Sequence, residues 1–579
     1  MKKITALLCS ILFIFTAVFA QDFTRADTLR GSNGPGRAWW DATKYDLHVN
    51  FNIADKSISG FNKISYQLTD KTSPGYFQID LQEPMRIDSV IWNSENSLSG
   101  SSTANRQKLS FKKDGNAWFV YLNTSNENVV DLKMHSKKET KESVAKSKQQ
   151  HGLDNQSITV YFQGKPKAAK NAPWDGGIVW SKDKAGNPWV AVACQGLGAS
   201  VWYPCKDYQG DEPDSAAMHF TASSDLVTVS NGRLRNKTVN ADGTSTYSWA
   251  VVSPINTYNI SPYVGKYVHF GEIFKGEKGD LTMDYWVIDS NLVKAKEQFK
   301  DAGRMMKAFE YWFGPYPFYE DGYKLVDAPY LGMEHQSGIA YGNGYMNGYR
   351  GRDLSGSGHG MKFDFIIIHE SGHEWFGNNI TSKDVADMWV HESFTNYSEA
   401  LFVEYYYGKK AGSEYVIGMR KNISNDKPVQ GVFGVQQEGS GSDMYYKGSN
   451  MIHTIRQVIN NDDTFRDILR SINKDFYHST VTGKQIEDYI TNKSGINFSK
   501  VFDQYLRTTK VPVLEFKNEK GVWSYRWTNC VKGFDMPVKI ILDNGEYEFI
   551  HPNESFKPLT KKISDFKVDP NFYIETKKG

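Results

Sequence analysis

The chain has 579 residues, too many for one hydrophobic core, so we expect several domains. Hydrophobic residues make up 40% of the chain and charged residues 23%, proportions that fit a soluble globular protein and exclude a disordered or fibrous one. The formal net charge is only +2, which argues against nucleic acid as the main partner, because such binders usually carry a strong basic excess.

The N-terminus has the organisation of a secretory signal peptide. Two lysines precede an apolar run over residues 4–19, and Val18 and Ala20 supply the small residues of a cleavage site. The apolar run is short for a membrane span, and no other stretch is long and apolar enough to cross a bilayer. We therefore expect residues 1–20 to be removed, and the mature chain to be periplasmic or extracellular without an integral membrane segment.

The next part of the chain has the alternation of β-strands. Apolar residues occupy every second position from Tyr45 to Ile53, and short runs of this kind, separated by Gly, Asn and Asp, continue to about Ile288. This pattern predicts a long antiparallel β domain over residues 21–288. The lysine-rich residues 136–150 within it indicate a solvated hairpin loop.

The mature chain would contain three cysteines, Cys194, Cys205 and Cys530. In an oxidising compartment Cys194 and Cys205 could pair and leave Cys530 free. Ordinary buried thiols explain the same residues equally well.

Around residue 290 the apolar period changes from two to that of a helix. Large apolar residues recur at helical spacing from Phe299 to Phe313, and Gly314 with the following proline ends that helix. Helix-like segments then dominate until about Thr508, which predicts a mainly helical domain over residues 289–508. The alternation of strands returns after that, so residues 509–579 should form a small β domain.

The helical region contains an H-E-x-x-H motif, which runs from His369 through Glu370 to His373. Residues four apart share one face of a helix, so both imidazoles can reach one metal ion. Glu370 lies one step around the helix, close enough to handle a water molecule. The motif alone is only moderately specific in a chain with 13 histidines, and a pair of structural core histidines is the alternative.

Glu392 follows His373 after eighteen residues, enough to finish one helix, turn, and bring a second helix alongside. Catalytic zinc takes three protein ligands and keeps one open position, and Glu392 is the candidate third ligand. Glu399 lies one heptad later on the same helix face, where its carboxylate is a candidate to hold an imidazole N–H. His391 points about 100° away from Glu392 around the helix, so we leave it out of the ligand set.

This motif and spacing resemble the gluzincin metallopeptidases, and within them the aminopeptidase N family, which also includes leukotriene hydrolase. The resemblance covers essentially the whole mature chain. It implies a multidomain α+β fold with a saddle-like N-terminal β domain, a thermolysin-like and mainly helical catalytic domain, and a small C-terminal β-sandwich. It also implies one Zn²⁺ per chain, bound by His369, His373 and Glu392.

A segment upstream of the zinc motif, Leu331 to His335, is similar to the G-x-M-E-N motif of that family. The glutamate of the family motif binds the free α-ammonium of the substrate, and Glu334 takes this role by position. A carboxylate about one residue from the scissile carbonyl is the chemistry that an aminopeptidase needs. Gly332 and Met333 would line the substrate, whereas Leu331 and His335 depart from the family's Gly and Asn.

Two further segments resemble the family. Residues 445–448 match its Y-x-K-G segment, which implies that Tyr445 stabilises the oxyanion, with Tyr446 as the alternative. Residues 193–196 resemble a stretch of the N-terminal domain in which a Gln or Glu reaches the terminal amine, and Gln195 has that position. A neutral Gln would leave Glu334 as the main charge on the amine.

The resemblance implies a zinc aminopeptidase that removes residues from the N-termini of peptides. In that reaction Glu370 would take a proton from the attacking water and pass it to the leaving amine. Three alternatives remain: a thermolysin-like endopeptidase, an epoxide hydrolase like the leukotriene relative, and a catalytically inactive peptide-binding protein on the same fold. Side-chain preference and oligomeric state are not encoded in these motifs.

Overall fold

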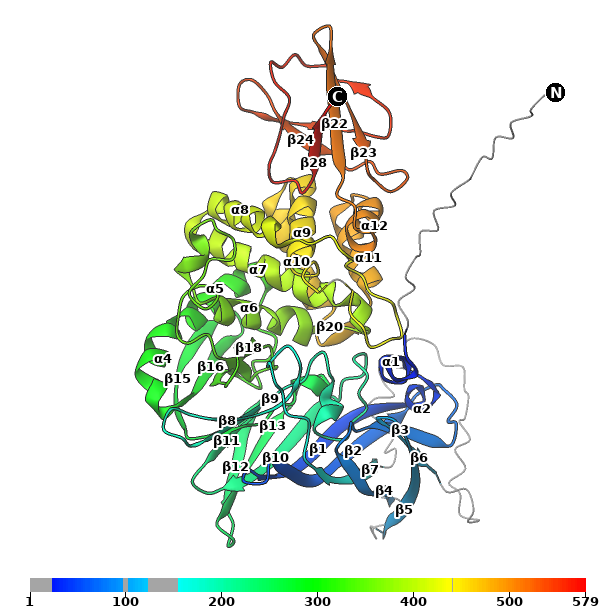
Figure 1. Cartoon of the computed structure of the whole chain (residues 1–579), viewed down its shortest axis with the longest axis vertical. Coiled ribbons are helices and arrows are strands. Elements are labelled where there is room, and N and C mark those ends of the chain that lie inside the picture. Colours follow the sequence, from blue (N-terminus) through cyan, green and yellow to red (C-terminus); the bar gives the residue numbers. More distant parts are fainter. Residues whose placement is uncertain (1–22, 97–102, 123–154, 440) are drawn as a thin grey trace, which may run out of the picture.

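The computed structural model describes residues 23–96, 103–122, 155–439 and 441–579. The predicted signal peptide over residues 1–20 and the predicted loop over residues 136–150 lie outside the described residues. In the described parts, β-sheets form the N-terminal region, helices dominate the middle and β-sheets return at the C-terminus (Figure 1). The predicted multidomain α+β architecture is thereby confirmed.

The N-terminal region begins with two short helices, α1 (Arg25–Gly31) and α2 (Pro35–Ala38). Its strands are β1 (Trp40–Asn52), β2 (Ser57–Leu68), β3 (Tyr76–Asp80), β4 (Arg86–Asn96), β5 (Thr103–Asp114), β6 (Ala117–Tyr121), β7 (Asn155–Gly164), β8 (Gly177–Lys182), β9 (Pro188–Ala193), β10 (Ser215–Ser223), β11 (Val227–Val229), β12 (Arg233–Val239), β13 (Thr244–Val251) and β14 (Tyr263–Gly265).

These strands form a ten-stranded sheet in the order β12-β13-β10-β1-β2-β7-β4-β5-β6-β3 and a four-stranded sheet in the order β11-β14-β9-β8. The ten-stranded sheet is antiparallel except at one place, where β1 and β10 run parallel. The alternating residues of β1, from Tyr45 to Phe51, are buried on one face as their period predicts. The opposite face of β1 is partly open to solvent.

A five-stranded sheet follows, in the order β15-β16-β17-β19-β18. Its strands are β15 (Tyr267–Gly276), β16 (Gly279–Ile288), β17 (Tyr323–Asp327), β18 (Gly332–Met333) and β19 (Ile339–Tyr341). Because β16 pairs directly with β17, this sheet spans the predicted domain boundary between residues 288 and 289. The same sheet brings β18, which Glu334 directly follows, to the helical region.

The helices of the middle region are α4 (Leu292–Gln298), α5 (Lys300–Phe313), α6 (Phe365–Gly372), α7 (Trp389–Tyr407), α8 (Lys409–Gly418), α9 (Tyr446–Ile459), α10 (Asp462–Asp475), α11 (Gly483–Ser494) and α12 (Ser499–Arg507). Two short strands, β20 (Ile380–Ser382) and β21 (Ser479–Val481), pair in parallel between them. As expected from the sequence, α5 ends at Gly314, whose φ of 92° is readily adopted only by glycine.

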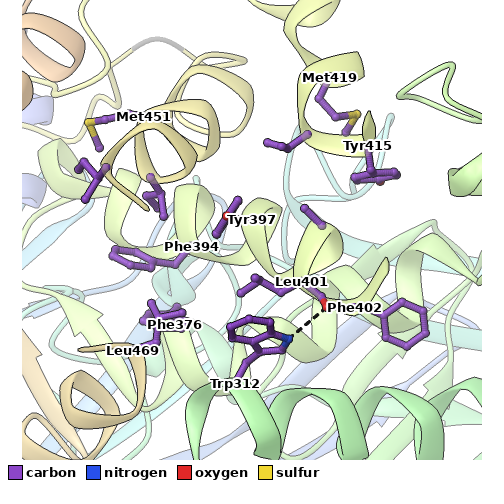
Figure 2. Packing of buried hydrophobic residues seen from close by; sticks show 14 of the residues in the cluster. Trp312, Phe376, Phe394, Tyr397, Leu401, Phe402, Tyr415, Met419, Met451 and Leu469 are labelled. Carbon is purple, nitrogen blue, oxygen red and sulfur yellow. Dashed lines mark hydrogen bonds between the residues drawn. The ribbon is translucent and has the colours of Figure 1, made fainter. Parts of the chain in front are cut away.

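The centre of this region is α7, in which every residue from Trp389 to Val403 is buried. Figure 2 shows its apolar side chains packed among those of neighbouring elements, with the Trp312 indole N–H of α5 donating to the Leu401 carbonyl at 3.2 Å. A helix that is buried all round has little freedom to tilt or rotate. Any functional side chain on α7 is therefore held firmly in place.

The C-terminal region has a four-stranded sheet, β26-β23-β22-β28, and a three-stranded sheet, β25-β24-β27. The strands are β22 (Val513–Glu519), β23 (Val522–Thr528), β24 (Val538–Ile541), β25 (Tyr547–Ile550), β26 (Lys557–Pro558), β27 (Lys567–Val568) and β28 (Glu575–Lys578). Phe516 of β22 stacks on Phe566, beside β27, with ring centroids 4.5 Å apart. Aromatic side chains thus fill the space between the two sheets, as in a β-sandwich.

All three cysteines of the predicted mature chain are free thiols. Cys194 and Cys205 are buried, and burial raises the pKa of both thiols. Of the two interpretations left open by the sequence, the structure therefore has the buried thiols rather than the disulfide. Among the described residues, none of the helices combines the length and the apolar character of a membrane span.

Candidate metal centre and active site

The H-E-x-x-H motif begins on α6 and ends at His373, the C-cap residue of this helix. Asp364 fixes where α6 begins. Its carboxylate accepts hydrogen bonds from the backbone N–H groups of Ile366 at 3.1 Å and Ile367 at 3.3 Å, so it caps the helix and complements its dipole. Every residue of α6 is buried. Burial and the cap together hold His369 and Glu370 in one orientation.

Both motif histidines direct the same ring nitrogen towards Glu392. The Nδ1 atom of His369 lies 2.7 Å from Glu399 Oε1, and that of His373 lies 3.0 Å from the Phe376 carbonyl oxygen. Each Nδ1 can therefore carry the proton, which leaves the two Nε2 atoms as electron-pair donors. These Nε2 atoms lie 3.8 and 3.4 Å from Glu392 Oε2, respectively.

Glu392 Oε2 is buried and makes no hydrogen bond to any described residue. A buried, unpaired carboxylate oxygen is costly unless a cation compensates it. The donor atoms of His369, His373 and Glu392 all lie within 4.8 Å of one another, and two imidazoles with one carboxylate suit zinc. Burial lowers the pKa of His373, but nearby carboxylates, Glu392 foremost, outweigh it and raise that pKa to about 10, which marks a surplus of negative charge.

Glu399, predicted to support an imidazole, does so together with its own partners. Its Oε1 atom also accepts from Asn396 Nδ2 at 2.9 Å, and its Oε2 atom accepts from the Tyr415 hydroxyl at 2.7 Å. Such partners orient a ligating imidazole and raise its basicity. His391 points elsewhere, since its Nε2 atom accepts from the Ser382 backbone N–H at 2.8 Å. The structure therefore keeps it away from the three ligand atoms, as the helical geometry predicts.

Glu370 sits directly under β18. A Cβ atom at Gly332 would lie 2.7 Å from Glu370 Oε1 and 2.8 Å from Ile366 Cγ2, so only glycine lets the strand pass this close to α6. Burial raises the pKa of Glu370 to about 7, with a further rise from the charge of Glu334 and an opposing effect of His369. A carboxyl with a pKa near neutrality is suited to accept and return a proton.

Glu334 lies at the end of β18 and is only 3% exposed. Its Oε1 atom accepts hydrogen bonds from Gln195 Nε2 and from the Tyr258 hydroxyl, the latter at 3.1 Å. The structure thus joins Glu334 to Gln195, 139 residues earlier in the chain. Burial raises the pKa of Glu334, the charge of His373 opposes this rise, and the charge of Glu392 adds to it.

His335 stands where the resembling motif has Asn, and its ring is fully buried. Its Nδ1 atom lies 2.6 Å from the Tyr263 hydroxyl, and burial lowers its pKa to about 3, so the ring is neutral. His335 therefore belongs to the packing between β14 and β18 rather than to the charged groups of the site.

Tyr445 precedes α9, and its ring stacks on the imidazole of His369 with centroids 5.9 Å apart. Burial raises the pKa of Tyr445, and the charge of Glu392, whose carboxylate its hydroxyl contacts, raises it further. The pKa of Tyr446 is raised by burial and by the charges of Glu399 and Tyr349 instead. Of the two tyrosines, Tyr445 is thus the one whose hydroxyl reaches the predicted metal ligands.

A cavity of about 630 Å³ lies between these elements. Its lining includes every predicted ligand and substrate residue together with both tyrosines. Glu399 is not part of the lining, but it contacts His369, which is. Trp174 and Glu438 are among the lining residues that sequence reasoning missed. Partial burial and the charges of Glu392 and Glu334 raise the pKa of Glu438 to about 7. Both lie on connecting segments without a motif, so only the folded chain could reveal them.

The fold and the arrangement of donor atoms resemble those of M1 zinc metallopeptidases. Residues 298–505 match the model of the Peptidase family M1 domain. This match confirms the predicted resemblance to aminopeptidase N-type gluzincins, and zinc is the cofactor that the resemblance implies.

Curated relatives match parts of the chain. Aminopeptidase N of Lactococcus lactis subsp. lactis is 28% identical over 162 residues, which cover 26% of this chain and 19% of the relative. Endoplasmic reticulum aminopeptidase 1 of Rattus norvegicus is 21% identical over 308 residues, covering 50% of this chain and 32% of the relative. The chain thus spans a fifth to a third of the length of these two proteins.

Solved structures extend the likeness of the fold. An M1 zinc metallopeptidase mutant from Deinococcus radiodurans, bound to a Tyr-Ser-Ala substrate, superposes with a TM-score of 0.62 at 17% identity. This match covers 82% of this chain and 95% of that one. A two-domain M1 zinc metallopeptidase bound to L-tryptophan gives a TM-score of 0.60 at 17% identity, covering 79% and 92%.

Proposed function

We propose that this protein is a zinc-dependent aminopeptidase that hydrolyses the first peptide bond of peptides with a free N-terminus. The observation that carries the proposal is Glu334, a buried carboxylate in the same cavity as the metal ligands. Its contacts to Gln195 and Tyr258 orient it but supply no positive charge. A substrate α-ammonium is the cation that completes this arrangement.

Each of the site residues has a separate role in the reaction. When bound, zinc supplies a Lewis acid that polarises the peptide carbonyl and makes water more acidic. Glu334 binds the α-ammonium and so places the first peptide bond beside the metal ligands. Glu370 accepts a proton from the attacking water and delivers it to the leaving amine. Tyr445 donates a hydrogen bond to the carbonyl oxygen as negative charge develops there.

The alternatives account for fewer of the observations. A thermolysin-like endopeptidase has no need for a buried carboxylate at the position of Glu334. An inactive peptide-binding protein has no need for Glu370 or for a tyrosine hydroxyl directed at Glu392. The cavity of about 630 Å³ suits a peptide terminus, and the Tyr-Ser-Ala substrate bound to a protein of similar fold supports peptides as the substrate class.

The test is hydrolysis of amino-acid p-nitroanilides beside their N-acetylated forms, with and without a zinc chelator. We expect chelator-sensitive cleavage of the free-amine set alone. Glu334→Gln should raise KM for these substrates, because an ion pair to the ammonium becomes a neutral contact. Equal cleavage of the acetylated set would move the assignment to an endopeptidase, and zinc binding without cleavage of either set would favour a binding protein.

We further propose that the chain is exported and that residues 1–20 are removed. Support comes from the basic and apolar organisation of those residues and from the small residues before Gln21. N-terminal sequencing of protein purified from the producing cells should find Gln21 first. A mature protein that begins at Met1 would overturn the proposal.

A further inference from the structure

A second group of metal-binding side chains lies on the N-terminal sheet, outside the cavity described above. Asp46 and His48 are two residues apart on β1, so both side chains leave the same face of the strand. His219 on β10 is the register partner of His48 in the parallel β1–β10 pair. Figure 1 shows β1 and β10 at the bottom of the molecule, away from α6 and α7.

Both imidazoles direct a ring nitrogen at the same oxygen of Asp46. His48 Nε2 lies 3.0 Å from Asp46 Oδ1, and His219 Nε2 lies 3.3 Å from the same oxygen. With metal–ligand distances of about 2.0 to 2.1 Å, neighbouring ligands of a tetrahedral zinc ion are about 3.3 Å apart. The observed separations are close to such edges, and the donor atoms of all three residues lie within 4.8 Å of one another.

Neighbouring residues hold both rings in this arrangement. Phe61 stacks on one side of His48 at 4.3 Å, and the ring of His219 stacks on the other side at 4.1 Å. The Nδ1 atom of His219 lies 2.8 Å from Ser248 Oγ, which can fix its tautomer. The side chains keep 26% to 37% of their surface exposed, so a metal ion can enter and water can complete its coordination.

We propose that Asp46, His48 and His219 bind a second zinc ion on the outer face of the ten-stranded sheet. Without a metal ion, the Nε2–H groups of both imidazoles would donate hydrogen bonds to one oxygen of Asp46. A bound zinc ion takes the place of these two protons. Lys63 faces Asp46 from β2 in register, and Lys44 lies two residues before it on the same face. The positive charges of these two lysines repel a zinc ion, so the zinc affinity of this site should be lower than that of the catalytic site.

A zinc ion here would join β1 to β10, the parallel pair in an otherwise antiparallel sheet. A ligand that binds only the folded state stabilises it by RT ln(1 + [L]/Kd), so the stabilisation grows with the zinc concentration. The inference does not depend on the aminopeptidase proposal, because its three residues lie outside the active-site cavity.

The test is the zinc content of the full-length mature protein after metal removal and re-equilibration with ZnCl₂, measured by elemental analysis. We expect two ions per chain in the unaltered protein and one in His219→Gln, which should keep its peptidase activity. Glu392→Gln should retain the outer ion. His269→Gln is the matched control, because His269 forms a single pair with Asp284 at 2.7 Å on a strand face and should still leave two ions bound.

Thermal unfolding gives an independent readout. In the Glu392→Gln background, added zinc should raise Tm, and this shift should disappear when His219→Gln or Asp46→Asn is added. Asp46→Asn keeps the size of the side chain and covers the case in which the His219 variant does not fold. Two ions in His219→Gln, or one ion in the unaltered protein, would overturn the proposal. If the protein binds a zinc ion that is lost in His219→Gln but has no peptidase activity, the aminopeptidase proposal is contradicted and the proposal of the outer zinc site still holds.

Discussion

At the scale of single residues, the active site is defined by which carboxylates have partners. Glu399 is satisfied by an imidazole, an amide and a hydroxyl. Glu334 accepts from an amide and a hydroxyl, which are both neutral, so its charge has no cationic partner among these contacts. Glu392 Oε2 has no hydrogen-bond partner among the described residues, and we propose that it binds the metal ion while Glu370 acts on the water molecule. Each role leads to a different expected defect when the carboxylate is removed.

Glu370→Gln should abolish peptide hydrolysis and leave zinc binding intact. The amide keeps the size of the side chain but cannot accept a proton from water, and general-base catalysis typically contributes about 10² to 10⁴ in rate. The measurement is kcat on an amino-acid p-nitroanilide together with zinc content. A variant that keeps more than about a tenth of the rate would contradict the role given to Glu370.

Glu399→Gln should weaken zinc binding about 10- to 100-fold, because His369 loses the carboxylate that orients it and raises its basicity. The zinc dissociation constant can be measured by competition with a chromophoric chelator. Tyr415→Phe is the graded control, since it removes one hydrogen bond to Glu399 and leaves its charge in place. Equal affinity in Glu399→Gln and the unaltered protein would show that this contact is dispensable.

At the scale of elements, the site depends on how closely helices and strands approach one another. The α6, α7 and α9 helices carry the motif histidines, the Glu392 and Glu399 pair, and the residues after Tyr445, respectively. Close approach is visible at Gly448 of α9, where a Cβ atom would lie 1.8 Å from Ser393 Oγ of α7. The Ser393 hydroxyl in turn donates to the Met444 carbonyl at 2.7 Å, just before Tyr445.

Gly448→Ala should therefore push α9 away from α7 and displace Tyr445. We expect a loss of stability of about 1 to 3 kcal/mol from overpacking and a fall in kcat larger than any change in KM. The measurements are Tm and steady-state kinetics. Ser393→Gly in the same chain removes the Cβ and Oγ atoms that the new methyl group meets, so the double variant should regain activity. Failure of this rescue would place the cause elsewhere.

The division into domains is also an element-scale question. The predicted boundary at residue 288 follows the change of apolar period from two to helical, yet β15 and β16 pair with β17 beyond it. Periodicity detects strands but does not show which sheet they join, because strand pairing is set by contacts distant in the chain. We propose a boundary near Gly265, after β14, which keeps the five-stranded sheet in one unit.

At the scale of the whole molecule, the site is assembled from separate regions. Gln195 and Tyr258 of the N-terminal region complete the contacts of Glu334. The C-terminal region is joined to the helices in a similar way, since His453 Nε2 of α9 lies 3.0 Å from Asn571 Oδ1 and its Nδ1 atom lies 3.0 Å from the Tyr397 hydroxyl. The burial of His453 between these partners affects the stability of the protein at acid pH.

Burial lowers the pKa of His453 to about 3, although its hydrogen bond to Asn571 opposes the shift. Its unfolded pKa is near 6.5, so below that pH the unfolded chain binds one proton more than the folded chain. This one residue should therefore reduce the free energy of unfolding by about 1.4 kcal/mol per pH unit as pH falls from 6.5 towards 3. Above pH 6.5 its contribution should not vary.

His453→Gln should make Tm less dependent on pH between 6.5 and 5, because glutamine does not titrate. The measurement is Tm by differential scanning fluorimetry at closely spaced pH values. Other buried histidines leave part of the pH dependence in place, so the comparison is between slopes. Identical slopes in the two proteins would contradict the buried, neutral state of His453.

The sequence by itself determined the parts that depend on local spacing. Residues four apart on a helix share a face, so His369 and His373 could be paired without a structure, and the heptad between Glu392 and Glu399 works in the same way. The strand alternation of β1 and the end of α5 at Gly314 also follow from local preferences. The assignments of Glu334, Gln195 and Tyr445 came from resemblance to a family rather than from spacing.

Only the tertiary structure decided which distant side chains meet. It placed Gln195 against Glu334, brought Glu438 into the cavity, and paired β1 with β10 so that His48 and His219 stack. These contacts join residues far apart in the chain, and their formation depends on the register of strands and the packing of buried faces. A local pattern encodes the shape of each element, whereas the sites arise where several elements bury their surfaces against one another.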